Sequence, residues 1–194
     1  MDAHNVVTMA GGMIMSRGLL HLYIGDGQGK TSAAVGLATR SAGGGMSVVF
    51  AQFLKGNNTG EVVSLETLGA KIFRSGQDFG FVWDMSAGQR DEFRKEQGRI
   101  LTEVCSIFGA GGVQGATSPT IIVLDEVLDA ITMNLVDEGL LRDFIDNKRE
   151  GVELVLTGHE APDWVCEIAD YITVMKKVKH PYDKGVEARA GIEF

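Results

Sequence analysis

The sequence predicts an α/β protein in which helices cover both faces of a mostly parallel sheet of about six strands. Short apolar runs such as LLHLYIG and SVVFAQFL alternate with helix-like stretches such as KTSAAVGLATRSAG. This alternation is typical of βαβ units, in which helices connect parallel strands. In addition, GDGQGKTS joins the first apolar run to the first helix-like stretch. A Gly-rich turn in this position is a phosphate-binding signal when a strand precedes it and a helix follows it.

The expected strands are short and apolar, and each is followed by a turn or a helix-like stretch. The run TIIVLDEV is apolar throughout until it reaches two acids, as in strands that are covered on both faces. Six strands are expected in LLHLYIG, SVVFAQFL, AKIFRSG, TIIVLDEV, VELVLTGH and YITVMKKV.

Three helices are expected in addition to the one that follows the Gly-rich turn. The longest spans about Ser86 to Phe108, a second spans about Val136 to Arg149, and the third is the short segment PDWVCEIAD. The Gly-rich residues 109–115 are interpreted as a mobile loop rather than a domain linker. The longest helix carries apolar side chains at helical spacing on one face, namely Phe93, Ile100, Val104 and Ile107.

Length and composition predict a single domain. The chain has 194 residues, and its 44% hydrophobic content is enough for one sizeable core. Residues 1–18 are small and polar without sustained periodicity, so we predict a flexible N-terminal segment followed by a domain over residues 19–194. Cys105 and Cys166 lie in expected helices, outside any CxxC or Cys/His cluster. Both are therefore expected to be free thiols in the core.

Charge and hydropathy argue against several classes of partner. The formal net charge of −8 opposes binding to nucleic acid or anionic lipid, because both require clustered Lys and Arg. No apolar run approaches the roughly 18 residues of a membrane span, and the start of the chain lacks the pattern of a signal peptide. We expect a cytoplasmic protein that acts on a small molecule, with no nucleic-acid or membrane partner.

The turn after the first strand is the predicted phosphate-binding loop. Glycines allow backbone N–H groups to point at phosphate oxygens, and the following helix adds its positive N-terminal end. The spacing departs from GxxxxGK[ST], because Ile24 stands where the first glycine is expected and Gly25 comes one residue late. An ordinary Gly-rich turn is the alternative, although it would not require Lys and Thr at the helix start. The expected ligand-binding residues are Gly25, Asp26, Gly27, Gln28, Gly29, Lys30, Thr31 and Ser32.

Asp125 and Glu126 are candidate magnesium ligands together with Thr31. They end the apolar run IIVLDE, and a phosphate-binding loop of this type takes an acid from the end of a neighbouring strand to organise Mg²⁺. Lys30 is expected to contact the phosphates. The alternative is that the two acids cap the next helix or are solvated. These features predict a three-layer RecA-like P-loop fold with a nucleoside triphosphate at the carboxyl edge of the sheet.

Further blocks of the sequence follow the phosphate-binding loop, and several of them, notably QFLKG, GFVW and the KHPYDKG to GIEF terminus, have no role in P-loop proteins in general. The blocks are QFLKG, GFVWDM, VLDE, LTG, EIAD and VKHPYDKGVEARAGIEF, which follow GDGQGKTS in this order. In this arrangement the chain, over residues 17–194, resembles the P-loop class of cob(I)alamin adenosyltransferases, also called ATP:corrinoid adenosyltransferases. The resemblance implies transfer of the 5′-deoxyadenosyl group of ATP to the Co(I) of a reduced corrinoid, with release of triphosphate. It also implies Mg²⁺, a homodimer and an electron-donating reductase.

The resemblance assigns roles to individual residues. Phe81 and Trp83 of GFVW are expected to fill the lower face of the corrin and exclude axial ligands from cobalt, which eases reduction to Co(I). The alternative is that both aromatics only pack in the core or a loop. Lys30 is expected to support the departing triphosphate. The family is expected to bind its nucleotide reversed relative to ordinary P-loop ATPases, and the late Gly25 fits such an altered cradle.

Five further residues are weaker candidates. Lys55 and Glu61 are expected near the carboxyl edge of the sheet, either at the ligand or in a solvated loop. Lys179 and His180 stand in the matching KHPYDKG block, either in contact with ligand or in a structural turn. His159 occupies a position where relatives are expected to carry Arg, and a neutral imidazole would bind phosphate more weakly.

Two other functions remain open at this point. The loop and Asp125/Glu126 alone are compatible with an ATPase or kinase that acts on another small molecule. A non-catalytic corrinoid carrier that binds ATP as a ligand is the second alternative.

Overall fold

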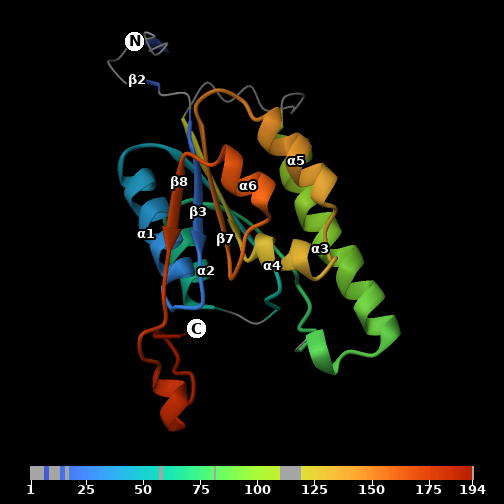
Figure 1. The fold of residues 1–194 in the computed structure, drawn as a ribbon. Helices are drawn as coiled ribbons and strands as arrows, with labels where there is room; N and C mark the ends of the chain where they lie inside the picture. Colours follow the sequence, from blue (N-terminus) through green and yellow to red (C-terminus); the bar gives the residue numbers. More distant parts are fainter. Residues whose placement is uncertain are drawn as a thin grey trace.

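The fold is a three-layer α/β structure built on a parallel sheet (Figure 1). The computed structural model describes residues 7–8, 14–15, 18–56, 59–80, 82–109 and 119–193. Within these ranges one six-stranded sheet has the order β5-β4-β6-β7-β3-β8, and every neighbouring pair is parallel. The predicted fold class is confirmed. The strands of this sheet are β3 (Leu20–Ile24), β4 (Ser47–Gln52), β5 (Lys71–Arg74), β6 (Thr120–Asp125), β7 (Val152–Gly158) and β8 (Tyr171–Val174).

Helices connect the strands on both faces of the sheet. Two of them, α2 and α4, were not expected from the sequence, because each spans only two turns and has no distinct apolar period of its own. The α-helices are α1 (Lys30–Gly43), α2 (Gly60–Thr67), α3 (Ala87–Phe108), α4 (Val127–Thr132), α5 (Glu138–Asp146) and α6 (Asp163–Ile168). Two short 3₁₀ helices are η1 (Val82–Asp84) and η2 (Pro181–Lys184).

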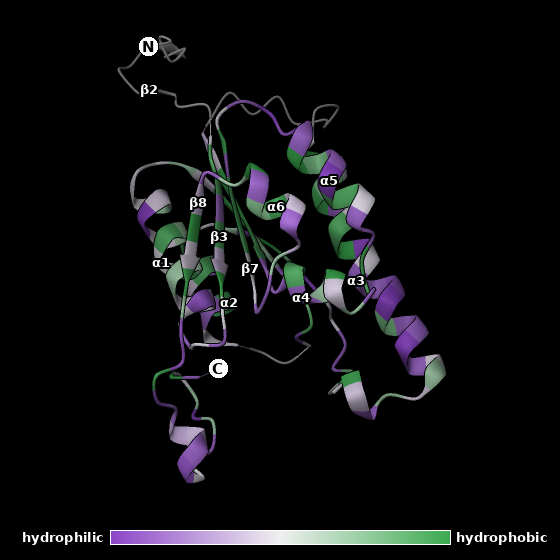
Figure 2. Cartoon of the chain, viewed as in Figure 1, coloured by the Kyte–Doolittle hydropathy of each residue, from purple (hydrophilic) through white to green (hydrophobic). Residues whose placement is uncertain are grey.

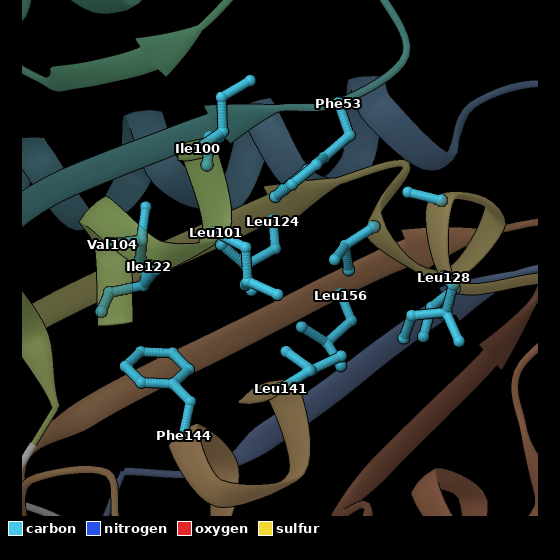
Figure 3. Close-up of a cluster of buried hydrophobic side chains, with 14 of the residues drawn as sticks. Phe53, Ile100, Leu101, Val104, Ile122, Leu124, Leu128, Leu141, Phe144 and Leu156 are labelled. Atoms are coloured by element: carbon cyan, nitrogen blue, oxygen red, sulfur yellow. The ribbon is translucent and has the colours of Figure 1, made fainter. Parts of the chain in front are cut away.

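Alternating residues of the central strands supply two cores, one on each face. On β6, Ile121 and Val123 face α1 and α2, whereas Ile122 and Leu124 face α3, α4 and α5. Figure 2 shows the apolar strands between helices whose outer surfaces are hydrophilic. In Figure 3 the larger core is seen from within, with Leu101 of α3 and Leu141 of α5 pointing toward Leu156 of the sheet. The helical layers therefore fix the sheet whose carboxyl edge carries the loops described below.

The long helix α3 agrees closely with its predicted span. Ser86 is its N-cap and forms a capping box with Gln89, since each side chain accepts from the other residue's backbone N–H. Phe93, Ile100 and Val104 are buried as expected, while Ile107 is only partly buried.

The helix α5 is shorter than the predicted span of about 136–149. Asp137 accepts the backbone N–H groups of Gly139 and Leu140 and so begins the helix at Glu138. The helix ends at Asp146.

The remaining expectations concern the N-terminal segment and the cysteines. Within residues 1–18, β1 (Val7–Thr8) pairs antiparallel with β2 (Ile14–Met15), and the flexibility of this segment stays a prediction. The predicted loop 109–115 lies outside the described residues from 110 onward. Cys105 and Cys166 are free and half-buried, and burial raises the pKa of the Cys105 thiol to about 12. No helix among the described residues has the length and apolarity of a membrane span.

Removing the Ser86 cap should destabilise α3. Ser86→Ala leaves the Gln89 N–H without its acceptor, and we expect the free energy of unfolding to fall by about 1 kcal/mol. Ser106→Ala is the matched control, because Ser106 is exposed in the last turns of the same helix and its hydroxyl donates to the backbone carbonyl of Glu103. Urea unfolding of both variants measures the difference. Equal stability of the two variants would contradict a stabilising role for the capping box.

Candidate functional site

The Gly25–Ser32 loop leads from β3 into α1 at the carboxyl edge of the sheet. Gly29 is the N-cap of α1 in a left-handed conformation (φ 111°) and offers no side-chain cap to the helix. The first N–H groups of α1 are therefore available to an anion, which the helix dipole also favours. Residues 28–32 line an open cavity of about 690 Å³. This half of the loop has the geometry expected of a phosphate site.

The first three loop residues face the segments that follow β7 and β8. The Gly25 N–H donates to the His159 carbonyl (2.9 Å), and the Gly27 N–H donates to the Met175 carbonyl (2.7 Å). The Asp26 carboxylate accepts the Lys177 N–H (3.0 Å), and this bond holds the pKa of Asp26 below its usual range. These three residues do not line the cavity, and ligand contact by Gly25, Asp26 and Gly27 stays a prediction.

Close packing explains two of the glycines in this loop. A Cβ at Gly25 would lie 2.3 Å from the Met175 carbonyl oxygen, and one at Gly27 would lie 2.7 Å from the same atom. Gly25 also has φ 115°, a conformation that side chains other than glycine rarely adopt. The late first glycine thus has a physical reason within the fold.

Lys30 folds back over the loop that precedes it. Its ammonium donates to the carbonyl oxygens of Gly25 (2.7 Å) and Gly27 (3.0 Å). Lys30 also lines the cavity. A positive charge therefore lies at the mouth of the α1 N-terminus, where phosphate oxygens would replace the carbonyls as acceptors.

Asp125 joins three elements of the site. Its side chain is fully buried, and its Oδ1 accepts hydrogen bonds from the hydroxyls of Thr31 (2.9 Å) and Thr157 (2.8 Å). Its Oδ2 lies 3.3 Å from the Lys55 ammonium. The structure thus brings two predicted metal ligands, Thr31 and Asp125, into direct contact.

Lys55 lies among three carboxylates. Besides Asp125, its ammonium is 3.2 Å from Glu126 and 3.9 Å from Glu61. Burial by itself would lower the pKa of Lys55, but the charges of Asp125, Glu126 and Glu61 outweigh it and raise that pKa above its usual range. Of the two alternatives for Lys55 and Glu61, the structure supports the ligand site, because both line the cavity.

Glu126, the third predicted metal ligand, contacts Lys55 (3.2 Å), and no contact with Thr31 is seen among the described residues. It has a left-handed backbone (φ 62°) and stands immediately before α4 as its N-cap residue, without a side-chain capping bond. Burial raises the pKa of its carboxyl group, although Lys55 acts in the opposite direction. The side chain lines the cavity, so the alternative that it caps the next helix is not supported.

The oxygen atoms near Thr31 suit a hard cation such as Mg²⁺. Hydroxyl and carboxylate oxygens are ligands that Mg²⁺ prefers, and it commonly binds through one or two carboxylates plus substrate phosphates. Within the described ranges, no group of three or more His, Cys, Asp or Glu side chains could hold a metal ion. Phosphate oxygens would therefore have to complete the coordination.

Several residues that sequence reasoning missed also form the site. The Thr157 hydroxyl makes two hydrogen bonds: it accepts from the Glu126 N–H (2.8 Å) and donates to the Asp125 carboxylate. Asp129 accepts from the His159 N–H (3.0 Å) and lies 3.1 Å from its Nδ1. The LTG block, which lies at the end of an expected strand, could have pointed to Thr157. Its position beside Asp125 could not be predicted, because it depends on the placement of β7 between β6 and β3 in the sheet.

The C-terminal tail lies against the same cavity. After β8 the chain runs beyond the carboxyl edge of the sheet and returns toward it (Figure 1), so that Gly191, Ile192 and Glu193 line the cavity. His180 accepts the Tyr182 N–H (3.2 Å) and caps η2, which favours the structural alternative for this residue. The Lys179 side chain is exposed.

The aromatic segment lies at the other end of the same edge. Phe81 lies outside the described residues, and Trp83 in η1 is 74% exposed. Neighbours anchor the segment, because Val82 is buried and the Phe79 ring packs on Phe93 of α3 with centroids 5.0 Å apart. The segment follows β5, which lies four strand positions from β3 in the sheet. At about 4.8 Å per strand, the two strands are about 19 Å apart. An exposed Trp on a fixed turn is suited to contact with an apolar ligand.

Comparison with known proteins identifies relatives of this chain. The family model for ATP:corrinoid adenosyltransferase BtuR/CobO/CobP matches residues 16–194. The corrinoid adenosyltransferase of Pseudomonas aeruginosa is 29% identical over 180 residues, which cover 92% of this chain and 84% of the relative. Those of Escherichia coli K12 and Salmonella typhimurium are 28% and 29% identical over 184 residues, covering 92% of this chain and 86% of each relative.

Adding a methyl group at Gly25 should disturb the loop. The Gly25→Ala Cβ would clash with the Met175 carbonyl in a disfavoured backbone conformation, and we expect a loss of about 2 kcal/mol or more in the free energy of unfolding. Gly98→Ala, in the interior of α3 with open space around it, is the control and should stabilise the protein by about 1 kcal/mol. Thermal unfolding compares the two variants. A stable Gly25→Ala protein would refute the packing explanation.

Proposed function

Because the chain belongs to the ATP:corrinoid adenosyltransferase family, we propose that the cavity at the carboxyl edge of its sheet holds the ATP of the adenosyl transfer. The convergence of Lys30, Thr31 and Asp125 at the N-terminus of α1 carries this proposal. The enzyme is a transferase that moves the 5′-deoxyadenosyl group of ATP to the Co(I) of a corrinoid. We assign the triphosphate to residues 28–32, with Gly25–Gly27 shaping the loop beneath it.

The reaction places specific demands on the protein. A Co–C bond forms, the bond between C5′ and its oxygen breaks, and the electron pair leaves with inorganic triphosphate. Co(I) is itself a strong nucleophile, so no side chain has to be activated for attack. The chain must hold C5′ in line with cobalt and stabilise the charge on the leaving group. Lys30 and the first N–H groups of α1 are suited to the second task.

We propose that Thr31 and Asp125, with Glu126 near by, hold a Mg²⁺ ion that accompanies ATP. The proposal is supported by their oxygen donors and by the 2.9 Å contact between the first two residues. When bound, Mg²⁺ neutralises part of the triphosphate charge.

We further propose that Phe81 and Trp83 cover the lower face of the corrin. The exposure of Trp83 supports this role, because a large apolar side chain at a fixed turn is suited to a flat apolar ligand. Covering this face would keep axial ligands from cobalt and ease its reduction.

A homodimer, an electron-donating reductase and a cytoplasmic location complete the proposal. The edge strand β8 supports the homodimer. It pairs only with β3 in the described sheet, and it exposes Tyr171, Ile172 and Val174. Exposed apolar residues on an edge strand are commonly covered by another chain.

Loss of the Lys30 ammonium should strongly slow product formation. Purified protein with ATP, Mg²⁺, cobalamin and a strong reductant should give a light-sensitive Co–C product and triphosphate, and Lys30→Ala should lower kcat/KM by about 100-fold or more. Lys95→Ala, at an exposed position of α3, should match the wild type. Absorbance before and after illumination reports the product, and phosphorus NMR reports triphosphate.

Other outcomes of this assay favour the alternative functions. Release of ADP and phosphate without alkylated cobalt would indicate an ATPase or kinase instead. In a separate measurement of cobalamin transfer to a cobalamin-dependent enzyme, unchanged transfer by Lys30→Ala would indicate a carrier.

The Trp83 ring should be needed for the reduction step rather than for ATP binding. With ATP and Co(II)alamin, the wild type should show a four-coordinate Co(II) signal in electron paramagnetic resonance. Trp83→Ala should lose most of this signal, while Trp83→Phe, which keeps an aromatic ring, should retain part of it. ATP affinity measured by calorimetry should stay within about twofold, since Trp83 does not line the ATP cavity. An unchanged signal in Trp83→Ala would contradict the assigned role.

A further inference from the structure

Lys55 has a position that the proposed reaction does not yet explain. Its side chain comes from the loop after β4, whereas Lys30 is the first residue of α1, which follows β3. Two strands, β6 and β7, lie between β4 and β3 in the sheet. Both lysines nevertheless line the same cavity. The cavity is therefore approached by ammonium groups from two sides.

Acids outnumber lysines in the lining of the cavity. Four carboxylates line it, of which Glu193 pairs with Arg189 (2.9 Å) outside the lining, and the described lining residues include two lysines and no arginine. A triphosphate placed beside these carboxylates would be repelled unless cations lie between them. Lys55 is the cation that already touches two of the lining acids, Glu61 and Glu126, as well as Asp125 behind them. The four acids are Glu61, Glu126, Asp129 and Glu193.

The backbone that carries Lys55 is held in an unusual conformation. Leu54 has φ 61°, which costs energy for a residue other than glycine and is maintained only where its surroundings impose it. The Leu54 N–H donates to Oε1 of Gln97 in α3 (3.0 Å), and the Gln97 side chain is fully buried. The preceding Phe53 N–H donates to the Asp125 carbonyl (3.0 Å).

The residue after Lys55 is fixed as well. The Gly56 carbonyl accepts from Arg74 (3.0 Å), and a Cβ at Gly56 would lie 2.3 Å from the Gln77 carbonyl oxygen. A surface ion pair needs no such framework. Fixed residues on both sides are the arrangement that holds a functional side chain in place.

We propose that Lys55 is a second lysine of the triphosphate site. Without nucleotide its ammonium balances Asp125, Glu126 and Glu61, and with nucleotide it pairs with phosphate oxygens of the ATP triphosphate. The three N–H donors of an ammonium allow it to exchange a carboxylate for a phosphate with little movement. This inference rests on the proposed ATP site, and it gives that site a cation on the side opposite Lys30.

Binding of inorganic triphosphate in the presence of Mg²⁺ tests the phosphate contact. In calorimetry, Lys55→Met should bind triphosphate about tenfold more weakly than the wild type or worse, because a charge-assisted hydrogen bond is lost. Lys55→Arg, which keeps the charge, should retain most of the affinity. Lys95→Met, at an exposed position of α3, is the control and should bind like the wild type.

Titration with Mn²⁺ alone tests the competition between Lys55 and a metal ion. Followed by electron paramagnetic resonance without phosphate, Lys55→Met should bind Mn²⁺ several-fold more tightly than the wild type, because the competing ammonium is gone. A purely structural role would not produce a gain in affinity. If Lys55→Met does not fold, Lys55→Gln, which keeps a hydrogen-bond donor among the carboxylates, should show the same two changes.

The outcomes separate this inference from the proposed function. Wild-type protein that binds triphosphate, with Lys55→Met binding it equally well, would overturn the role of Lys55 and leave the ATP site in place. Wild-type protein that binds neither triphosphate nor ATP would overturn both.

Discussion

The buried carboxylate of Asp125 is the interaction on which the site depends. Asp125 is the last residue of β6, in the middle of the sheet. One of its carboxylate oxygens accepts hydrogen bonds from hydroxyl groups at the start of α1 and near the end of β7, and the Lys55 ammonium lies next to the other oxygen. An ionised group with no exposed surface is tolerated only when its oxygens are satisfied in this way. The need to satisfy Asp125 therefore fixes Thr31, Thr157 and Lys55 relative to one another. The start of α1, the end of β7 and the loop after β4 converge because one buried carboxylate requires their side chains.

The helix α3 connects the two ends of the site. It begins directly after the η1 turn that carries Trp83, and about three turns further along Gln97 holds the backbone N–H of Leu54 next to Lys55. A shift of α3 would move both the aromatic segment and the loop at the ATP cavity. The same helix is anchored in the larger core through Phe93 and Ile100. Packing of α3 thus sets the distance between the corrin side and the nucleotide side of the proposed reaction.

Much of the fold could be predicted because its signals are local. Apolar runs located the six strands, and helical spacing from Phe93 to Val104 located α3. Strand order is not local, so the position of Thr157 between β3 and β6 could not be predicted from its own segment. The contacts of Lys55 with three acids also depend on strand order. The proposed role of Trp83 comes from the resemblance alone, because one aromatic residue in a turn has no period. The role of Phe81 stays a prediction, since this residue lies outside the described part of the chain.

The late first glycine shows how one sequence feature can have two explanations. By resemblance, it fits a cradle for a reversed nucleotide. In the fold, Gly25 and Gly27 are required by the approach of Met175, and their N–H groups bond to protein carbonyls. In the proposed complex the triphosphate is therefore bound by the later residues of the loop, from Gln28 onward, which line the cavity. The two explanations are compatible, because a loop whose start is held against Met175, directly after β8, presents its second half to the cavity. In the proposed complex, the triphosphate then lies between Lys30 and Lys55, which both line the cavity.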